Sequence, residues 1–509
     1  MAAYSDLHAY YGDIHNHCAI SYGLGSLEDA LANARERLDF VSITGHAHWP
    51  DMPEPNARVQ HIIDFHEEGF AKLKKGWQAM METLRETDEE GSFIIYPAFE
   101  VHFCATGDRN VLYKDLQGDI LYPQDLADLN KQLRVLREQG HDSLAQPHHV
   151  GYKTGTRGID WKSFDPEFAP VAEMLSMHGC SESNENPLPF LHVMGPSDWE
   201  STIQYGLAQG NIFGFTGGTD HHSGHPGSYG HGLTGVWAND LSRDGIWDAM
   251  YQRRTWAMTG DRIDLKFAID GQAMGSVIKP GAKKQIDIEV AAGAAIDYVD
   301  IIKNNRLLKR FSQCDFAAPE TKSDNQSIRT KLHLELGWGP RKKTQHWEVE
   351  FGIREGKILQ VEPRFRGQQV VSPLEADGEN KSCHSAHVNH RSDTAVQFTA
   401  VSEGNANNFS PSMQGMCLEI EATPESIVYA VINGQTWQWP LATLIEGARS
   451  DLTNGIESPA LRIHRAALPE ELNWHCQFED QSHDGDFYYT RVRQKNEQWA
   501  WSSPIFAKN

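Results

Sequence analysis

The stretch Tyr11-Gly12-Asp13-Ile14-His15-Asn16-His17 has the pattern of a β-strand that ends in two histidines. Residues i and i+2 of a strand point to the same side, so we expect the imidazoles of His15 and His17 on one face, about 6–7 Å apart at the backbone. Two such imidazoles can hold one metal ion or bridge a pair of ions. We expect Asp13 to orient a ligand imidazole through the free N–H of that ring.

Residues of the same kind follow several other short apolar runs. The residues at the ends of these runs are His46, Glu100, His148 with His149, His178, and the pair Asp220 and His222. In β/α barrels, the C-terminal ends of the strands converge on the active site. Imidazole and carboxylate ligands together suit Zn²⁺, Mn²⁺ or Fe²⁺, and the lack of an organised cysteine set argues against a structural zinc site.

The first half of the chain alternates strand-like runs with helical patterns. Residues 41–44, 93–96 and 143–145 read as strands. Ser26, with Asp29 three residues later, predicts a capped helix start. Residues 56–87 have the apolar spacing of a long helix. Strands separated by helices predict parallel β/α units.

After about Arg262 the pattern changes to period-two alternation. It occurs in the runs 285–290, 332–336, 347–351, 418–422 and 487–492. Such alternation is typical of antiparallel sheets and sandwiches. We therefore predict two units: a catalytic barrel over 1–262, with a helical insert at about 56–87, and a β-rich region over 263–509. Asn304-Asn305 predicts a hairpin turn. The polar segments 315–328, 374–393 and 402–413 predict long surface loops.

Composition narrows the class of protein. The chain has 509 residues and a formal net charge of −23, so nucleic acid and anionic membranes are unexpected partners. No signal peptide and no apolar run long enough to cross a bilayer is recognised. The seven cysteines are scattered and lack CxxC spacing, which predicts reduced thiols in a cytoplasmic protein.

The order of these motifs resembles the polymerase-and-histidinol-phosphatase (PHP) superfamily. Asp13-x-His15-x-His17 is followed by histidines and a glutamate at strand ends and then by Gly218-Thr219-Asp220-x-His222. The stretches 217–227, 233–237, 253–260 and 500–505 look more narrowly like a poorly characterised PHP-like family with a β-rich C-terminal half. The resemblance implies a distorted seven-stranded β/α barrel with two or three divalent metal ions.

The resemblance also implies a set of metal ligands. They are His15, His17, His46, Glu100, His148, His178, Asp220 and His222. Glu100 would bridge two ions. The superfamily often has aspartate where this chain has Gly45. Because His148 and His149 are adjacent, either of them can be the ligand.

Four residues near these motifs are candidates to bind an anionic substrate. They are Arg109, Lys153, Arg157 and His231. Arginine and lysine suit phosphoryl oxygens. Besides Glu100, the catalytic candidates are His149 and His225, either of which could protonate the leaving group.

We expect a metal-dependent hydrolase in which a hydroxide bridged by metal ions cleaves a small phosphate or phosphonate ester. One alternative keeps the metal centre but cleaves a sulfate ester, lactone, amide or other carbonyl derivative. A second alternative is a carbohydrate- or partner-binding protein in which the barrel is a scaffold and tryptophans of the second half form a stacking platform.

Overall fold

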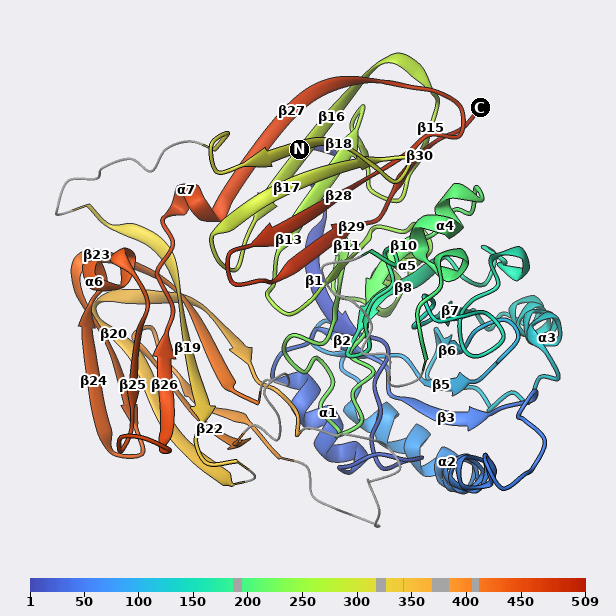
Figure 1. Cartoon of the computed structure of the whole chain (residues 1–509), viewed down its shortest axis with the longest axis horizontal. Helices are drawn as coiled ribbons and strands as arrows, with labels where there is room; N and C mark the ends of the chain where they lie inside the picture. Colours follow the sequence, from blue (N-terminus) through green and yellow to red (C-terminus); the bar gives the residue numbers. More distant parts are fainter. Residues whose placement is uncertain (186–194, 317–325, 342, 369–383, 405–411) are drawn as a thin grey trace.

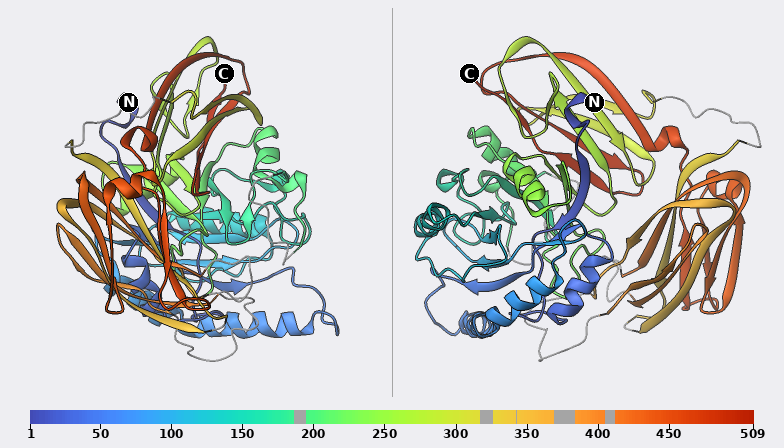
Figure 2. Two further views of the ribbon diagram at one scale, coloured as in Figure 1. Left: turned by 60° about the vertical axis from the view of Figure 1, so that its left-hand side comes forward. Right: turned by 180° about the vertical axis from the view of Figure 1, so that it is seen from behind.

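The computed structural model describes residues 1–185, 195–316, 326–341, 343–368, 384–404 and 412–509. Figure 1 shows three parts: a mixed α/β part at the lower right, antiparallel strands above it, and a separate sheet of long strands on the left. Figure 2 shows the same three parts from two further directions.

The strands of the α/β part lie in three sheets. In the first, β1 (His8–Asp13), β2 (Phe40–Val41) and β4 (Ile94–Ile95) run parallel. β11 (Leu233–Ala238) pairs antiparallel with β1, and β12 (Thr255–Met258) pairs antiparallel with β11. The second contains β3 (Thr44–His48), β5 (Ala98–Val101), β6 (Arg109–Tyr113) and β7 (Ser143–Pro147). The third contains β8 (Val171–Ser176), β9 (Gly179–Cys180) and β10 (Gly214–Gly217).

Parallel pairing is present where β/α units were predicted. β1 pairs with β2, β2 with β4, β3 with β5, and β8 with β10, all in parallel. Antiparallel pairs interrupt this order, because β5, β6 and β7 follow one another as neighbours. Within the described residues the strands therefore form three sheets and not one closed ring of seven. The fold is mixed α/β, and a barrel is not shown.

Five helices surround these sheets: α1 (Leu27–Arg35), α2 (Gln60–Thr87), α3 (Leu126–Glu138), α4 (Ile203–Ala208) and α5 (Arg243–Tyr251). Ser26 caps α1 in the predicted capping box with Asp29. The long helix α2 packs against β3 and begins at Gln60, four residues later than expected. The delay has a local cause, because Asn56 forms a turn in which its side chain accepts the N–H of Arg58.

The end of the chain completes the first sheet. β29 (Trp499–Ser502) pairs with β12, and β28 (Phe487–Gln494) links it to β17 (Ile296–Lys303) and β30 (Ile505–Ala507). The short strand β15 (Val277–Ile278) adds to β30, and β18 (Arg306–Ser312) adds to β17 through the predicted turn, where Asn304 and Asn305 both have positive φ. A four-stranded sheet packs beside them, with β14 (Gln272–Ala273), β13 (Asp264–Ile269), β16 (Gly281–Ala291) and β27 (Asn473–Ser482).

One hydrophobic core joins residues from both sides of position 262. It includes Leu31 and Trp77 from the first half and Phe267, Val299 and Val492 from the second. The division at residue 262 stays a prediction, and both the first sheet and its core continue across that position.

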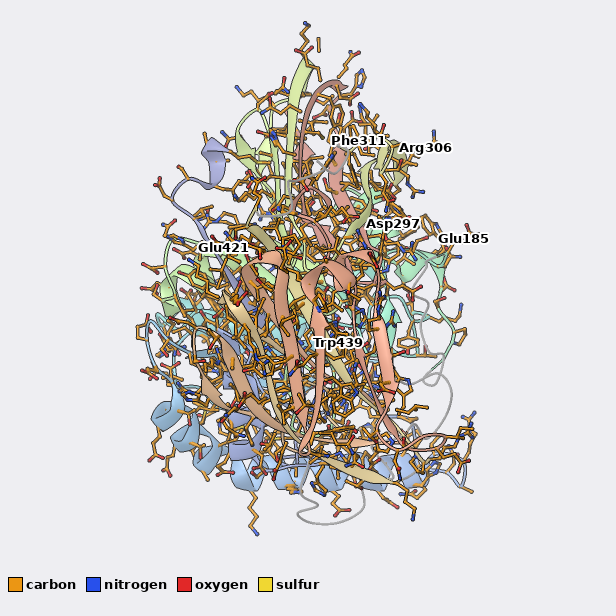
Figure 3. All side chains as sticks on the ribbon, turned by 90° about the vertical axis from the view of Figure 1, so that its left-hand side faces the viewer. Glu185, Asp297, Arg306, Phe311, Glu421 and Trp439 are labelled. Atoms are coloured by element: carbon orange, nitrogen blue, oxygen red, sulfur yellow. The ribbon has the colours of Figure 1, made fainter. Side chains whose placement is uncertain are left out.

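The remaining strands form an eight-stranded sheet with its own core. Its strands are β19 (Ile328–Trp338), β20 (Thr344–Arg364), β21 (His387–Arg391), β22 (Ala395–Glu403), β23 (Gln414–Ile432), β24 (Gln435–Pro440), β25 (Arg449–Leu452) and β26 (Pro459–Ile463). The short helices α6 (Leu441–Glu446) and α7 (Pro469–Leu472) follow β24 and β26. Figure 3 views the molecule with this sheet in front and labels Trp439 on β24.

The five runs of period-two alternation all lie in strands, as predicted. The predicted loops can be compared with the structure only in part. Segments 315–328 and 402–413 lie largely outside the described residues, and so does the first half of segment 374–393. Within the second half of segment 374–393, His387–Arg391 form β21, which pairs with β22 at the edge of the eight-stranded sheet.

Two further observations concern the predictions about membrane-spanning segments and cysteines. None of the helices that the structure describes combines the length and the apolar character needed to cross a membrane. No disulfide links the six described cysteines, and Cys383 lies outside the described residues.

Candidate metal centre

The segment after β1 places His15 and His17 against the loop that carries Asp220. The N–H of Asp220 donates to the carbonyl of His15 (2.7 Å), and the N–H of His17 donates to the carbonyl of His221 (2.9 Å). Both imidazoles face one carboxylate oxygen: Nε2 of His15 is 3.3 Å and Nε2 of His17 is 3.1 Å from Asp220 Oδ1. The two histidines therefore converge, as their i, i+2 spacing predicts.

Glu100, at the end of β5, lies at the centre of the histidines. Its Oε2 faces Nε2 of three imidazoles, those of His15 (3.7 Å), His17 (3.4 Å) and His46 (3.6 Å). Its Oε1 faces Nε2 of His148 (3.2 Å) and Nδ1 of His102 (3.4 Å). One buried carboxylate thus presents each of its oxygens to a different group of imidazoles, which is the arrangement required of a bridging ligand.

His178 and His222 complete the set on the side of Asp220. Nε2 of His178 is 3.0 Å from Asp220 Oδ2. The ring of His222 stacks on that of His17, with centroids 4.2 Å apart, and its Nδ1 is 3.8 Å from Asp220 Oδ1. The structure therefore brings all eight predicted ligands into one buried cluster. The clusters could bind metal ions, and four overlapping groups of three or four side chains have ligand atoms within 4.8 Å of one another.

Burial and mutual contact set the protonation of these groups. Burial acts to raise the pKa of Asp220, but the adjacent His15 and His178 hold it well below its ordinary value. Burial and the neighbouring His17 lower the pKa of His46 well below its ordinary value, and that of His222 to about 3. The ionised carboxylate of Asp220 and the neutral imidazoles of His46 and His222 are in the protonation states that bind metal. His15 differs: burial acts to lower its pKa, but Asp220 and Glu173 raise it well above its ordinary value.

Glu173 on β8 supports the cluster from outside. Its Oε2 is 2.6 Å from Nδ1 of His15, and its Oε1 accepts the N–H of His149 (3.1 Å). This contact leaves Nε2 of His15 directed at Glu100 and Asp220. The predicted orienting residue, Asp13, instead accepts the N–H groups of His15, Thr219 and Gly227. Among the described residues it contacts no imidazole ring. The sequence signal for Glu173 is a carboxylate within the otherwise apolar strand Val171–Ser176.

We predict that Glu173→Gln weakens metal binding by about 10–100-fold, the usual cost of losing a carboxylate that orients a ligand histidine. The amide keeps the size of the side chain but removes the charge that holds the Nδ1 proton of His15. Competition with a chromophoric chelator measures the change in affinity. Unchanged affinity in a folded variant would show that Glu173 does not orient His15.

Asp108 forms a second part of the cluster that the sequence analysis missed. Its Oδ2 is 3.3 Å from Nδ1 of His102, 3.1 Å from Nη1 of Arg157 and 3.7 Å from Nε2 of His149. Burial opposes ionisation, but His102 and Arg157 hold the pKa of Asp108 well below its ordinary value. Asp108 lies in the turn before β6, so the rule based on strand ends does not select it. His148 faces Glu100 and His149 faces Asp108, so the two adjacent histidines line different sides of the cluster.

The predicted substrate-binding residues are spread over different places. Arg157 lies at the edge of the cluster beside Asp108, over the ring of Trp49. Lys153 is exposed and pairs with Asp198. The prediction for Arg109 is corrected, because its buried guanidinium donates to the carbonyls of residues 106–108.

Two predicted histidines lie in the loop behind Asp220. His231 stacks on His221 and contacts the hydroxyl of Ser228. His225 is buried, and burial and the nearby Arg37 lower its pKa to about 3. In the part of the chain that the structure describes, no hydrogen bond or ion pair links His225 to Glu100 or Asp220, and its catalytic role stays a prediction.

Comparisons with known proteins give partial matches. A family model described as a protein of unknown function, DUF3604, matches residues 219–271. The chain is 36% identical to an uncharacterized protein of Chlamydia trachomatis serovar D over 188 residues, which are 34% of this chain and 30% of that protein. It is 28% identical to an uncharacterized protein of Chlamydia pneumoniae over 261 residues, 46% of this chain and 40% of that protein.

The chain thus spans less than half the length of these relatives. Among solved structures, it is similar to a two-domain protein from Bacteroides vulgatus that contains a predicted PHP-like metal-dependent phosphoesterase. The TM-score of that similarity is 0.31 at 16% identity, over 59% of this chain and 80% of the other.

Proposed function

We propose that the chain is a metal-dependent hydrolase that cleaves small phosphate or phosphonate esters. The observation that carries this proposal is the position of Glu100, whose two carboxylate oxygens face separate groups of imidazoles inside one buried cluster. The PHP-like order of motifs in the sequence is consistent with the same activity.

The residues present fit divalent metal ions. Glu100 Oε2, His15 Nε2 and His148 Nε2 are buried and have no hydrogen-bond partner of acceptable geometry among the described residues. Buried polar atoms without partners are costly and rare in folded proteins. Two or three ions of manganese, zinc or iron, held by the eight ligands above, would satisfy these atoms.

Bound divalent ions supply Lewis acidity, which activates water and stabilises charge on phosphoryl oxygens. The protein's own groups hold and orient the reactants. Glu173 fixes the ring of His15, and Arg157 is placed to donate to anionic oxygens at the edge of the cluster. Of the two histidines predicted to protonate the leaving group, His149 lies in the cluster, beside Asp108.

We predict that Arg157→Ala raises KM for an anionic ester by about 10–100-fold, the effect of losing a hydrogen bond to a charged group. Lys153→Ala is the matched control, since its ammonium is exposed and pairs with Asp198 instead. Steady-state kinetics on both variants measures the difference. Equal KM values for the wild-type protein and Arg157→Ala would remove Arg157 from the substrate site.

The proposal is tested by measuring metal content per chain together with hydrolysis of nitrophenyl phosphomonoester, phosphodiester, phosphonate, sulfate and carboxylate substrates. Two or three equivalents of metal with cleavage of phosphorus esters is the expected result. Bound metal with cleavage of the sulfate or carboxylate ester alone would keep the centre and replace the substrate class. Absence of metal after reconstitution would overturn the assignment of the ligands.

The remaining features of the proposal are the partners and the location of the protein. A net charge of −23 disfavours nucleic acid and anionic membranes as partners and leaves a small anionic substrate, drawn in by the metal ions and Arg157. A cytoplasmic location is part of the proposal.

A further inference from the structure

A second group of histidines and a carboxylate lies in the eight-stranded sheet, outside the centre described above. It consists of His333 and Glu335 on β19 and His464 directly after β26. These three side chains have ligand atoms within 4.8 Å of one another. Neither the sequence motifs nor the proposed hydrolase activity involves them.

The sheet itself brings the three residues together. His333 and Glu335 are two apart on one strand, so they share a face, while Leu332, Leu334 and Leu336 point into the core of the sheet. The N–H of His464 donates to the carbonyl of His333 (2.8 Å), which continues the pairing of β19 with β26. As a result the two imidazoles stack, with centroids 4.5 Å apart and an interplanar angle of 10°.

His464 and Glu335 pair with each other, whereas His333 has an unpartnered nitrogen among the described residues. Nε2 of His464 is 2.6 Å from Oε2 of Glu335. His333 is 6% exposed, and its Nε2 is buried without a hydrogen-bond partner in the described part of the chain. The residue opposite Glu335 on β23 is Gly415, and a Cβ there would lie 2.7 Å from this nitrogen. Glycine therefore leaves open the space beside the unpartnered atom.

The surroundings favour a neutral imidazole and a fixed carboxylate. Burial, followed by the nearby Arg364, lowers the pKa of His333 well below its ordinary value, and a neutral imidazole has one ring nitrogen whose lone pair is free to bind a metal ion. Arg366 lies 3.9 Å from Oε1 of Glu335, so the other oxygen, Oε2, is the one directed at His464. The guanidinium of Arg366 is held by the carbonyls of Tyr229 and Met413.

We propose that His333, Glu335 and His464 bind one transition-metal ion, with Zn²⁺ as the ion that best suits two imidazoles and a carboxylate. The site is independent of the proposed hydrolase centre. Its ion would tie β19 to the segment after β26. The ring of Tyr229, in the loop after His222, lies 5.9 Å from that of His333, so the site adjoins that loop.

The test compares zinc per chain by elemental analysis in the full-length protein and in His464→Gln and Glu335→Gln, after equilibration with Zn²⁺ and gel filtration. His475→Gln is the control, because His475 also pairs with one carboxylate, Asp287, but belongs to no cluster of three ligands. We expect both site variants to hold one equivalent fewer than the wild-type protein and the control. Equal stoichiometry in all four folded proteins would overturn the site and leave an ordinary His–Glu ion pair.

A second measurement covers the case in which the variants fail to fold. Crystals of the wild-type protein soaked in Zn²⁺ should give an anomalous peak between His333 Nε2 and Glu335 Oε2, and an empty map there would overturn the proposal. Neither readout depends on catalysis. A hydrolase assay that fails while the peak is present would therefore reject the proposed function and keep this site.

Discussion

Asp220→Asn should remove turnover and at least one equivalent of metal together. Asp220 faces His15, His17 and His178, with oxygen-to-nitrogen distances of 3.0 to 3.3 Å, and no other carboxylate of the described residues contacts all three. Losing a residue that only orients a metal ligand costs about 10–100-fold, so losing a ligand itself should exceed about 100-fold in kcat/KM. Asparagine keeps the shape of the side chain, so the fold should persist.

The measurements are metal per chain and kcat/KM on the best ester of the panel. Asp244→Asn is the matched control, because Asp244 on α5 is an exposed carboxylate that pairs with Lys114. The control should keep wild-type metal content and activity. Full activity in Asp220→Asn would mean that the catalytic centre lies elsewhere, whereas lost activity with full metal content would give Asp220 a role in chemistry and not in binding.

The sequence predicted the residues of this cluster better than the architecture that holds it. His15, His17, Asp220 and His222 follow from the spacing of ligands at strand ends, which is a local property of the chain. Glu173 and Asp108 were missed for different reasons. Glu173 lies inside a strand, and Asp108 lies in a turn, so their contribution depends on which sheets meet, and local spacing does not reveal that.

The difference between local spacing and contacts of distant segments also explains why the sequence predicted a closed barrel that the structure does not show. Short apolar runs separated by helices specify β/α units, and the parallel pairs of β1, β2 and β4 agree with this. Whether seven such units close depends on pairing between distant segments. Here β6 and β7 follow β5 as antiparallel neighbours, and β11 and β12 join β1 to strands from the end of the chain. A two-residue strand such as β2 carries too little sequence to predict its partners.

Trp501→Ala should give a large loss of stability, about 3–5 kcal/mol for a fully buried tryptophan. Trp501 is 0% exposed on β29, opposite Ala257 of β12. Its indole N–H donates to Glu182 Oε2 (2.9 Å), a carboxylate that also accepts from Tyr489 and Arg491. This network joins the end of the chain to the segment after β9.

Trp501→Phe separates the contribution of the buried apolar volume from that of the hydrogen bond to Glu182. It keeps most of the apolar volume and loses the hydrogen bond to a charged group, so it should cost about 1.5–3 kcal/mol. Trp439→Ala is the control, because Trp439 is partly buried against the separate core of the eight-stranded sheet. Urea unfolding followed by far-UV circular dichroism gives the free energies.

The two cores predict how these variants should differ. β29 pairs with β12, β12 with β11, and β11 with β1, so Trp501 belongs to the sheet that carries His15 and His17. Trp501→Ala should therefore lower the urea concentration at which bound metal is released, and Trp439→Ala should leave that concentration unchanged. The buried positions of Trp347, Trp499 and Trp501 also oppose their use as a carbohydrate-stacking platform. If metal release were unaffected by Trp501→Ala, the terminal strands would not stabilise the metal centre, and the first half of the chain would form that centre alone.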